Sequence, residues 1–133
     1  MVVVMGGDPD KELIPEAAEQ RCSEVSTELE LASLYATVSN KAWYIEDNIY
    51  DFNEGTDEYR SACDLTRRWF ALEEKLRTRI FAILISEGVT IPQKGQNQVI
   101  IPFMKRNGFL DMGGWWIAEN ELKATNRYSK HLK

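Results

Sequence analysis

Two long apolar seams, separated by one glycine-containing turn, constrain the fold of this chain more than any other feature of its sequence. In the first seam, apolar side chains recur at alternating steps of four and three residues: Leu31, Tyr35, Val38, Ala42, Ile45, Ile49 and Phe52. The second seam has a similar spacing: Leu65, Trp69, Leu72, Leu76, Ile80 and Ile83. Such steps place side chains on one face of an α-helix. We therefore predict two long helices, the first beginning near Pro15 or Ser23 and the second ending at Glu87.

Four residues between the seams, Asn53-Glu54-Gly55-Thr56, carry signals that stop one helix and start the next. Gly55 suits the left-handed conformation just past a helix end, and Thr56 suits the N-cap of the following helix. Asp57 and Glu58 then occupy a first turn, where the positive end of the helix dipole favours carboxylates. So short a connection predicts that the two helices lie antiparallel and side by side.

The apolar band on both helices is wider than the seams, so the hairpin requires a third layer from the C-terminal third or from a partner chain. Apolar and aromatic residues outside the seams include Leu34, Trp43, Tyr44, Tyr50, Phe70, Phe81 and Leu84. In the C-terminal third we predict a short helix from Gln98 to Arg106, in spite of Pro102. A small β-hairpin from Phe109 to Ile117, around Gly113-Gly114, is expected to follow it.

Together these patterns predict a mainly α protein, built on a long antiparallel helix hairpin with a short third helix and a small β-hairpin near the C-terminus. At 133 residues the chain fits one domain. We expect a flexible leader over residues 1–13, a single helical-hairpin domain over 14–120 and a polar, basic tail over 121–133.

The composition argues against a membrane-spanning protein and against general nucleic-acid binding. No apolar run approaches the ~20 residues that span a bilayer. The apolar start of the chain lacks the basic flank of a signal peptide, so a cytoplasmic location is expected. Residues 1–58 carry 14 acidic and 3 basic side chains, whereas residues 88–133 carry 3 and 7. Phosphate attraction requires clustered Lys and Arg, which leaves nucleic-acid binding through the C-terminal third as a weaker alternative.

No familiar catalytic or metal-binding motif occurs in the sequence. The only histidine is His131, and Cys22 and Cys63 are too far apart to form a C-x-x-C pair or, along the hairpin, a disulfide. Glu73 and its neighbour Glu74 are adjacent carboxylates, but adjacent helix residues point about 100° apart. Glu73 is instead expected to form a surface ion pair with Arg77, four residues on. We therefore predict no catalytic residues, no metal and no cofactor.

The segment between Lys105 and Ile117 is the first candidate binding region, because it combines two cations, three glycines and three aromatic residues. Its candidate residues are Lys105, Arg106, Phe109, Trp115 and Trp116. Trp side chains bury a large area and keep an N–H for a partner, and Arg with Trp can stack on a base. In a strand the two tryptophans face opposite ways. Core packing, a protein-binding surface and a ligand or nucleotide site all remain open.

The second candidate is an acidic face on the first helix, formed by Glu24, Glu28, Glu46, Asp47 and Asp51. Such a run is commonly no more than a solvated helix face. It also presents negative charge that a basic protein partner could recognise.

One stretch carries a resemblance to other proteins. Ile101-Pro102-Phe103-Met104-Lys105-Arg106-Asn107-Gly108, then Gly113-Gly114-Trp115-Trp116-Ile117 and the segment Ile45 to Asp51, cover about a quarter of the chain. They resemble small uncharacterised helical proteins of Gram-positive bacteria and their mobile elements. The resemblance implies a small bacterial accessory protein and assigns no role to any residue.

The function expected from the sequence is that of a non-enzymatic protein-interaction module, acting as a homodimer and serving as an accessory or inhibitor protein. The surplus apolar band, the charge asymmetry and the lack of reaction chemistry favour it. The competing hypothesis is a small-ligand or nucleotide binder centred on Arg106, Trp115 and Trp116. That hypothesis requires a concave pocket beside these residues.

Overall fold

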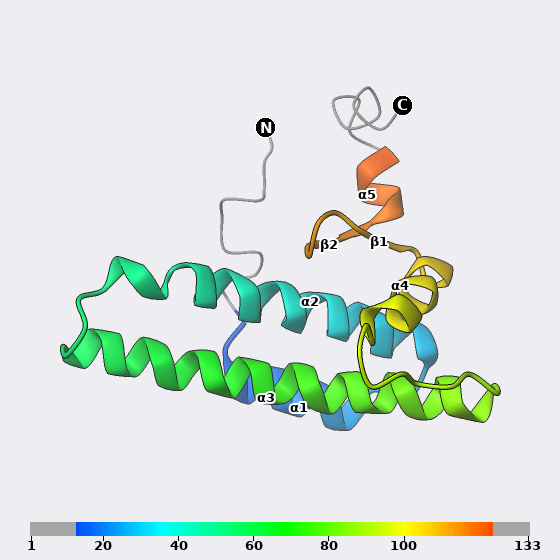
Figure 1. Cartoon of the computed structure of the whole chain (residues 1–133), viewed down its shortest axis with the longest axis horizontal. Coiled ribbons are helices and arrows are strands. Elements are labelled where there is room, and N and C mark those ends of the chain that lie inside the picture. Colours follow the sequence, from blue (N-terminus) through cyan, green and yellow to red (C-terminus); the bar gives the residue numbers. More distant parts are fainter. Residues whose placement is uncertain (1–12, 124–133) are drawn as a thin grey trace.

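A computed structural model describes residues 13–123 and confirms the antiparallel helix hairpin (Figure 1). Its first limb contains α2 (Glu28–Asp47) and a short 3-10 turn, η2 (Ile49–Asp51), and its second limb is the 30-residue helix α3 (Asp57–Ser86). The two helices lie side by side along most of their length. The protein is mainly α, as the two seams predict.

The turn between the limbs follows the sequence signals. Gly55 has a φ of +86°, a conformation that residues with a side chain rarely adopt. The Thr56 hydroxyl oxygen accepts a hydrogen bond from the backbone N–H of Tyr59 at 3.2 Å, which caps α3. At the other end of α3, Gly88 with a φ of +89° ends the helix.

The first limb is not one continuous helix, and here the prediction was wrong. A separate helix, α1 (Pro15–Glu24), ends before an extended residue, Val25. Thr27 then starts α2 with a capping box, in which its side chain accepts from the N–H of Glu30 and the Glu30 carboxylate accepts from the N–H of Thr27. A capping box satisfies N–H groups that a continuous helix would otherwise bond, and it favours a new helix start. The first seam is not buried along its whole length, because Phe52 beyond η2 is 42% exposed.

Because of this break, α1 folds back and covers α3, as a third layer that the sequence did not predict. The Arg79 guanidinium donates to the backbone oxygens of Cys22 at 2.8 Å and Val25 at 3.3 Å, where α1 ends. Near the start of α1, Arg68 pairs with Glu16 at 3.0 Å. Cys22 is buried and Cys63, on α3, is half-buried, and both are free thiols.

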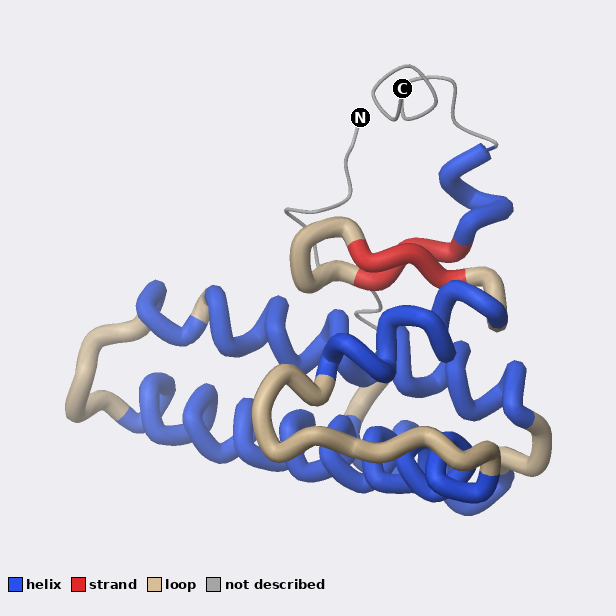
Figure 2. Tube along the Cα trace, turned by 45° about the vertical axis from the view of Figure 1, so that its right-hand side comes forward, coloured by secondary structure: helices blue, strands red, loops and turns tan. Residues whose placement is uncertain are grey.

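The C-terminal third supplies the predicted third layer against α2. It contains α4 (Asn97–Arg106), an antiparallel pair of strands, β1 (Phe109–Asp111) and β2 (Trp116–Ala118), and the short helix α5 (Glu119–Lys123). Leu110 pairs with Ile117 in the centre of the two-stranded sheet. Pro102 lies inside α4, on its exposed side, and does not end it. Figure 2 shows the two strands above α2 and beside α4.

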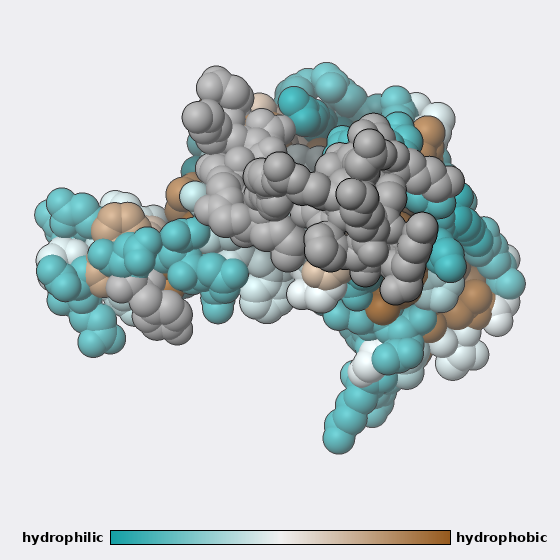
Figure 3. Space-filling view, turned by 90° about the horizontal axis from the view of Figure 1, so that it is seen from above, coloured by the Kyte–Doolittle hydropathy of each residue, from teal (hydrophilic) through white to brown (hydrophobic). Residues whose placement is uncertain are grey.

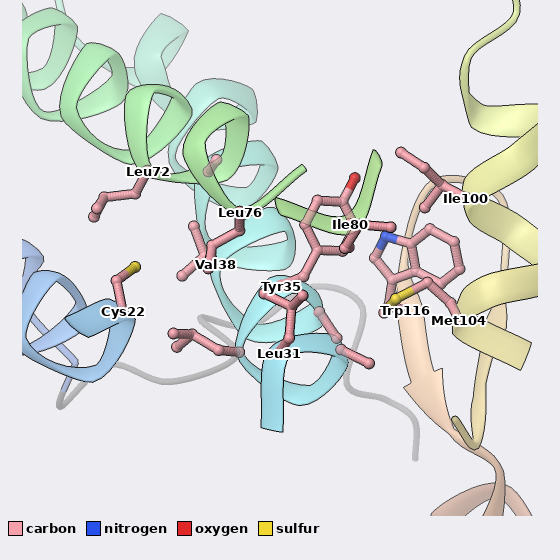
Figure 4. Close-up of a cluster of buried hydrophobic side chains, with 14 of the residues drawn as sticks. Cys22, Leu31, Tyr35, Val38, Leu72, Leu76, Ile80, Ile100, Met104 and Trp116 are labelled. Carbon is pink, nitrogen blue, oxygen red and sulfur yellow. The ribbon is translucent and has the colours of Figure 1, made fainter. Parts of the chain in front are cut away.

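The far end of the hairpin, around the turn at Gly55, projects beyond these covering layers, as views from the side and from above show (Figures 1 and 3). The core therefore lies in the middle of the molecule and toward the α4 end. Its largest fully buried side chains are Trp69, Phe103, Leu76, Ile80, Ile100, Met104 and Val38. Figure 4 shows how Tyr35 of α2 reaches Trp116 of β2 across this core.

The predicted leader, residues 1–13, lies outside the described residues except for Leu13, which is 4% exposed and packs in the core. The predicted tail begins within α5, and residues 124–133 lie outside the described part. Among residues 13–123, no helix combines the length and apolar character needed to cross a bilayer.

Candidate functional site

A cavity of about 710 Å³ lies between α2, α3, the start of α4 and the loop of the β-hairpin. Six aromatic side chains line it: Tyr35, Trp43, Tyr44, Phe70, Trp115 and Trp116. Its volume falls within the range of about 300–1,000 Å³ that is usual for small-molecule sites. Its polar lining includes three carboxylates and one guanidinium. Its size and its aromatic and charged lining make this cavity the candidate site.

The aromatic walls are held in fixed orientations by edge contacts. Trp43 and Phe70 meet at a centroid distance of 5.0 Å with their planes at 87°. Tyr35 and Trp116 meet at 6.2 Å and 60°. Such edge-to-face pairs are preferred over flat stacking because the positive edge of one ring meets the negative face of the other. Trp43 remains 45% exposed, so part of its surface is open to a ligand.

A buried carboxylate, that of Glu73, lies among these rings. Glu73 is 6% exposed and accepts a hydrogen bond from the Tyr35 hydroxyl at 3.0 Å, and it lies 3.6 Å from the Arg77 guanidinium. Burial raises the pKa of Glu73, while Arg77 and the Tyr35 hydroxyl oppose that rise. Burial and the neighbouring carboxylate also raise the pKa of Tyr35 above its usual range. The ion pair with Arg77 was expected, but its expected surface position was wrong.

The sequence contains a signal for this burial. Glu73 lies four residues after Trp69 and three before Leu76, so it shares the apolar face of α3 with two fully buried residues. What the sequence does not reveal is the partner that makes burial tolerable. Tyr35 lies 38 residues away on the other helix.

One amide side chain of α2 forms hydrogen bonds with the backbone of β2. Asn40, which is 7% exposed, donates to the Trp116 backbone oxygen at 2.8 Å and accepts from the Trp116 N–H at 2.9 Å. Within the hairpin loop, the Asp111 carboxylate accepts from the N–H of Gly114 at 2.8 Å. These bonds place the loop, with Trp115 and Asp111, at one wall of the cavity.

Of the five residues predicted in the first binding region, only the two tryptophans line the cavity. Trp116, at the start of β2, is 8% exposed, and Trp115, just before the strand, is half-buried. Phe109 is half-buried against the core, and Lys105 is exposed. The cation of the cavity is Arg77, not Arg106.

Arg106 instead joins three helix ends. Its guanidinium donates to both carboxylate oxygens of Glu28, at 2.8 Å each, and to those of Glu87 at 3.0 and 2.7 Å. It also lies 5.0 Å from the centroid of the Phe103 ring. Asn107 adds a hydrogen bond to Glu28 at 2.7 Å. Arg106 therefore links the end of α4 to the start of α2 and the end of α3.

Replacing Arg106 by alanine is expected to lower the free energy of unfolding by about 1–2 kcal/mol, because two bidentate but half-exposed pairs are lost. The hydrogen bonds from Arg106 and then Asn107 lower the pKa of Glu28. That stabilisation is present above the ordinary pKa of 4.5 and is lost as pH falls through the folded-state value. Urea denaturation should therefore show a difference between variant and wild type that shrinks on acidification.

Arg60→Ala is the matched control for this prediction. Arg60 pairs with Asp57 three residues earlier, with both side chains largely exposed. Its removal is expected to cost no more than about 0.5 kcal/mol. If the two variants lost equal stability, Arg106 would not link the helix ends as described.

The predicted acidic face does not exist as one surface. Glu24 belongs to α1, and Glu28 is held by Arg106 at the start of α2. Glu46 and Asp47 lie at the opposite end of α2, a rise of roughly 27 Å along the helix axis. Asp51 lies beyond them on η2. The break between α1 and α2 separates Glu24 from the rest, and only the last three residues gather in one region.

No family model matches the chain, and no curated protein or solved structure matches it. The similarity to small proteins of Gram-positive bacteria therefore stays a prediction. Within residues 13–123, no group of three or more His, Cys, Asp or Glu side chains comes together as a metal site would require.

Proposed function

We propose that this protein binds a small organic cation in the cavity between the helix hairpin and the β-hairpin. The observation that carries the proposal is the combination of aromatic walls with an excess of carboxylates. Aromatic cages recognise ammonium groups because the ring faces are negative, and each such contact contributes about 0.5–2 kcal/mol depending on desolvation. The cavity provides several aromatic side chains within one partly enclosed space.

The charges of the lining support a cationic ligand over an anionic one. Asp47, Glu73 and Asp111 supply three carboxylates, and Arg77 is the one guanidinium among the described lining residues. Arg77 lies within ion-pair distance of Glu73, so much of its charge is already balanced. Asp47 and Asp111 remain to attract a cation.

Binding without chemistry fits the polar groups of the cavity best. The Glu73 carboxylate is engaged by Tyr35 and Arg77, which restricts it as a base. Both cysteines lie outside the lining residues. We therefore extend the proposal to a non-enzymatic binding role.

Calorimetric titration with choline and with its neutral isostere 3,3-dimethylbutan-1-ol tests the proposal. The two differ in charge and hardly in shape, so choline is expected to bind at least about tenfold more tightly. Asp47→Asn and Asp111→Asn should each weaken choline binding by about 3- to 10-fold. Asn at position 111 can still accept from Gly114, which keeps the loop in place.

Glu74→Gln is the control variant, since Glu74 is exposed on α3 and does not line the cavity. It should leave the affinity unchanged. Equal binding of choline and its neutral isostere would refute the proposal. So would the absence of binding heat with choline, spermidine and trimethyllysine at about 1 mM, a concentration that half-fills a site of millimolar affinity.

A further inference from the structure

The projecting end of the hairpin carries a second surface, which adjoins the cavity where Tyr44 and Asn48 line both. We define the hairpin tip as residues 44–65, which comprise the end of α2, η2, the turn and the first turns of α3. α1 contacts α3 further along, at Arg68 and Arg79, and the β-hairpin is bound to α2 at Asn40. Figures 1 and 2 both show the tip extending past the other described elements. The tip is thus two helical segments without a third layer from residues 13–123.

An apolar groove of about 570 Å³ runs between the two segments of the tip. Its apolar lining comes from Tyr44, Ile45 and Phe52 on one limb and from Ala62 and Leu65 on the other. Phe52 is 42% exposed, and Ile45 and Leu65 are only partly buried. The seam that is covered in the centre of the hairpin continues here uncovered. Such patches mark interaction surfaces.

The tip around the groove is predominantly negative, and we call its carboxylates the acidic rim. Six carboxylates and no cation lie between Lys41 and Arg60: Glu46, Asp47, Asp51, Glu54, Asp57 and Glu58. Asp57 and Glu58 line the groove itself. The first cation beyond them, Arg60, pairs with Asp57. In Figure 3 this end of the molecule shows apolar side chains between hydrophilic ones.

We propose that the tip groove docks a basic amphipathic helix of a partner protein. A groove between two antiparallel helices fits a third helix, whose apolar residues at steps of three and four fill it. Lys and Arg along the flanks of that helix would meet the acidic rim, which favours fast and selective association. The apolar lining would thus contact the apolar face of the partner helix, and the acidic rim would contact its Lys and Arg side chains.

The charge also argues against a second copy of the tip as the occupant. In a symmetric dimer the same patch meets itself. Six carboxylates on each side would then oppose each other, and like charges brought together at an interface are costly. A partner rich in Lys and Arg relieves the repulsion already present within the tip.

Fluorescence anisotropy with three labelled 14-residue peptides tests the proposal. The first is an amphipathic helix of Leu and Lys, the second replaces each Lys by Glu, and the third is a scrambled Leu/Lys peptide without a helical apolar face. We expect the first to bind at least about tenfold more tightly than either of the others. Its affinity should fall as salt rises.

Two variants locate the binding site. Phe52→Ser should weaken binding of the amphipathic Leu/Lys peptide at least about tenfold, because an exposed aromatic at a groove commonly dominates such contacts. Ile85→Ser is the matched control, since Ile85 is 60% exposed at the opposite end of α3. It should leave binding unchanged. Replacing Asp51, Glu54 and Glu58 by their amides should reduce the salt dependence.

Equal binding of the scrambled peptide, or equal binding by wild type and Phe52→Ser, would overturn the proposal. Sedimentation of the protein alone supplies a further check. A concentration-dependent dimer that Phe52→Ser abolishes would assign the groove to a second copy of this chain and overturn the partner helix.

Discussion

Replacing Trp116 by alanine is expected to lower the free energy of unfolding by about 3–5 kcal/mol, because a buried indole leaves a large cavity in the core. Trp116 is 8% exposed and contacts the ring of Tyr35 edge-on. It is the core residue that β2 contributes. The loss should therefore appear first as detachment of the two strands from α2.

Urea denaturation measures the loss of unfolding free energy, and amide hydrogen exchange measures the detachment of the strands. The amides of β1 and β2 should exchange faster in Trp116→Ala even where the hairpin helices remain protected. Trp115→Ala is the matched control, because Trp115 is only half-buried beside the cavity. It should cost about 1 kcal/mol or less. Equal losses for the two tryptophans would contradict the inward packing of Trp116.

The same variant bears on the cavity, because Asn40 holds the backbone of Trp116 and not its side chain. Trp116→Ala keeps both of these hydrogen bonds available and removes the packing. If choline binding is lost in Trp116→Ala while α2 and α3 stay folded, the site requires the Trp116 indole, either as a lining ring or as the side chain that seats the β-hairpin.

Local signals in the sequence predicted most of the helix hairpin. Gly55 and Thr56 act within a few residues of where they lie, and the seam residues such as Leu76 repeat at a regular spacing. The break before Thr27 also has a local sequence signal, the Thr27 and Glu30 pair of a capping box. It was missed because the helical pattern continues on both sides of it, and a capping box outweighs pattern continuity.

The candidate site could be predicted only in part, because its contacts join residues distant in sequence. Two adjacent tryptophans indicated the region, and alternation along a strand indicated that they would face opposite ways. Arg106 was a candidate for contact with a partner or a ligand, yet its partners Glu28 and Glu87 lie 78 and 19 residues away. No spacing rule connects such positions. The same holds for Tyr35 and Glu73, whose pairing depends on how two helices are set against each other.

Replacing Tyr35 by phenylalanine is expected to destabilise the protein by about 1.5–3 kcal/mol at pH 7, since the lost hydrogen bond is made to a buried charged group. Burial already raises the pKa of Glu73 above 4.5. Without the hydroxyl of Tyr35, which favours the ionised form, that pKa should rise further. Tyr44→Phe, which also changes a cavity tyrosine, should cost less.

The pH dependence distinguishes this role from simple packing. A carboxylate whose folded-state pKa is raised destabilises the fold while it is ionised, and stability is regained as pH falls through that pKa. The deficit of Tyr35→Phe relative to wild type should therefore shrink as the pH falls through the raised pKa of Glu73, where that carboxylate takes up a proton. Glu16, Glu28 and Glu30 have lowered pKa values and act in the opposite direction. They are common to both proteins, so they cancel in the difference.

Glu73→Gln completes the test, because it keeps an oxygen that can accept from Tyr35 and removes the titrating group. In that background, Tyr35→Phe should cost about 0.5–1.5 kcal/mol, the value of an ordinary hydrogen bond, at every pH. A deficit that stayed constant with pH in the Glu73 protein would contradict a charged hydrogen bond at this position. If the deficit depends on pH only when Glu73 is present, the effect belongs to the Tyr35–Glu73 pair. Both residues of this pair line the cavity of the proposed cation site.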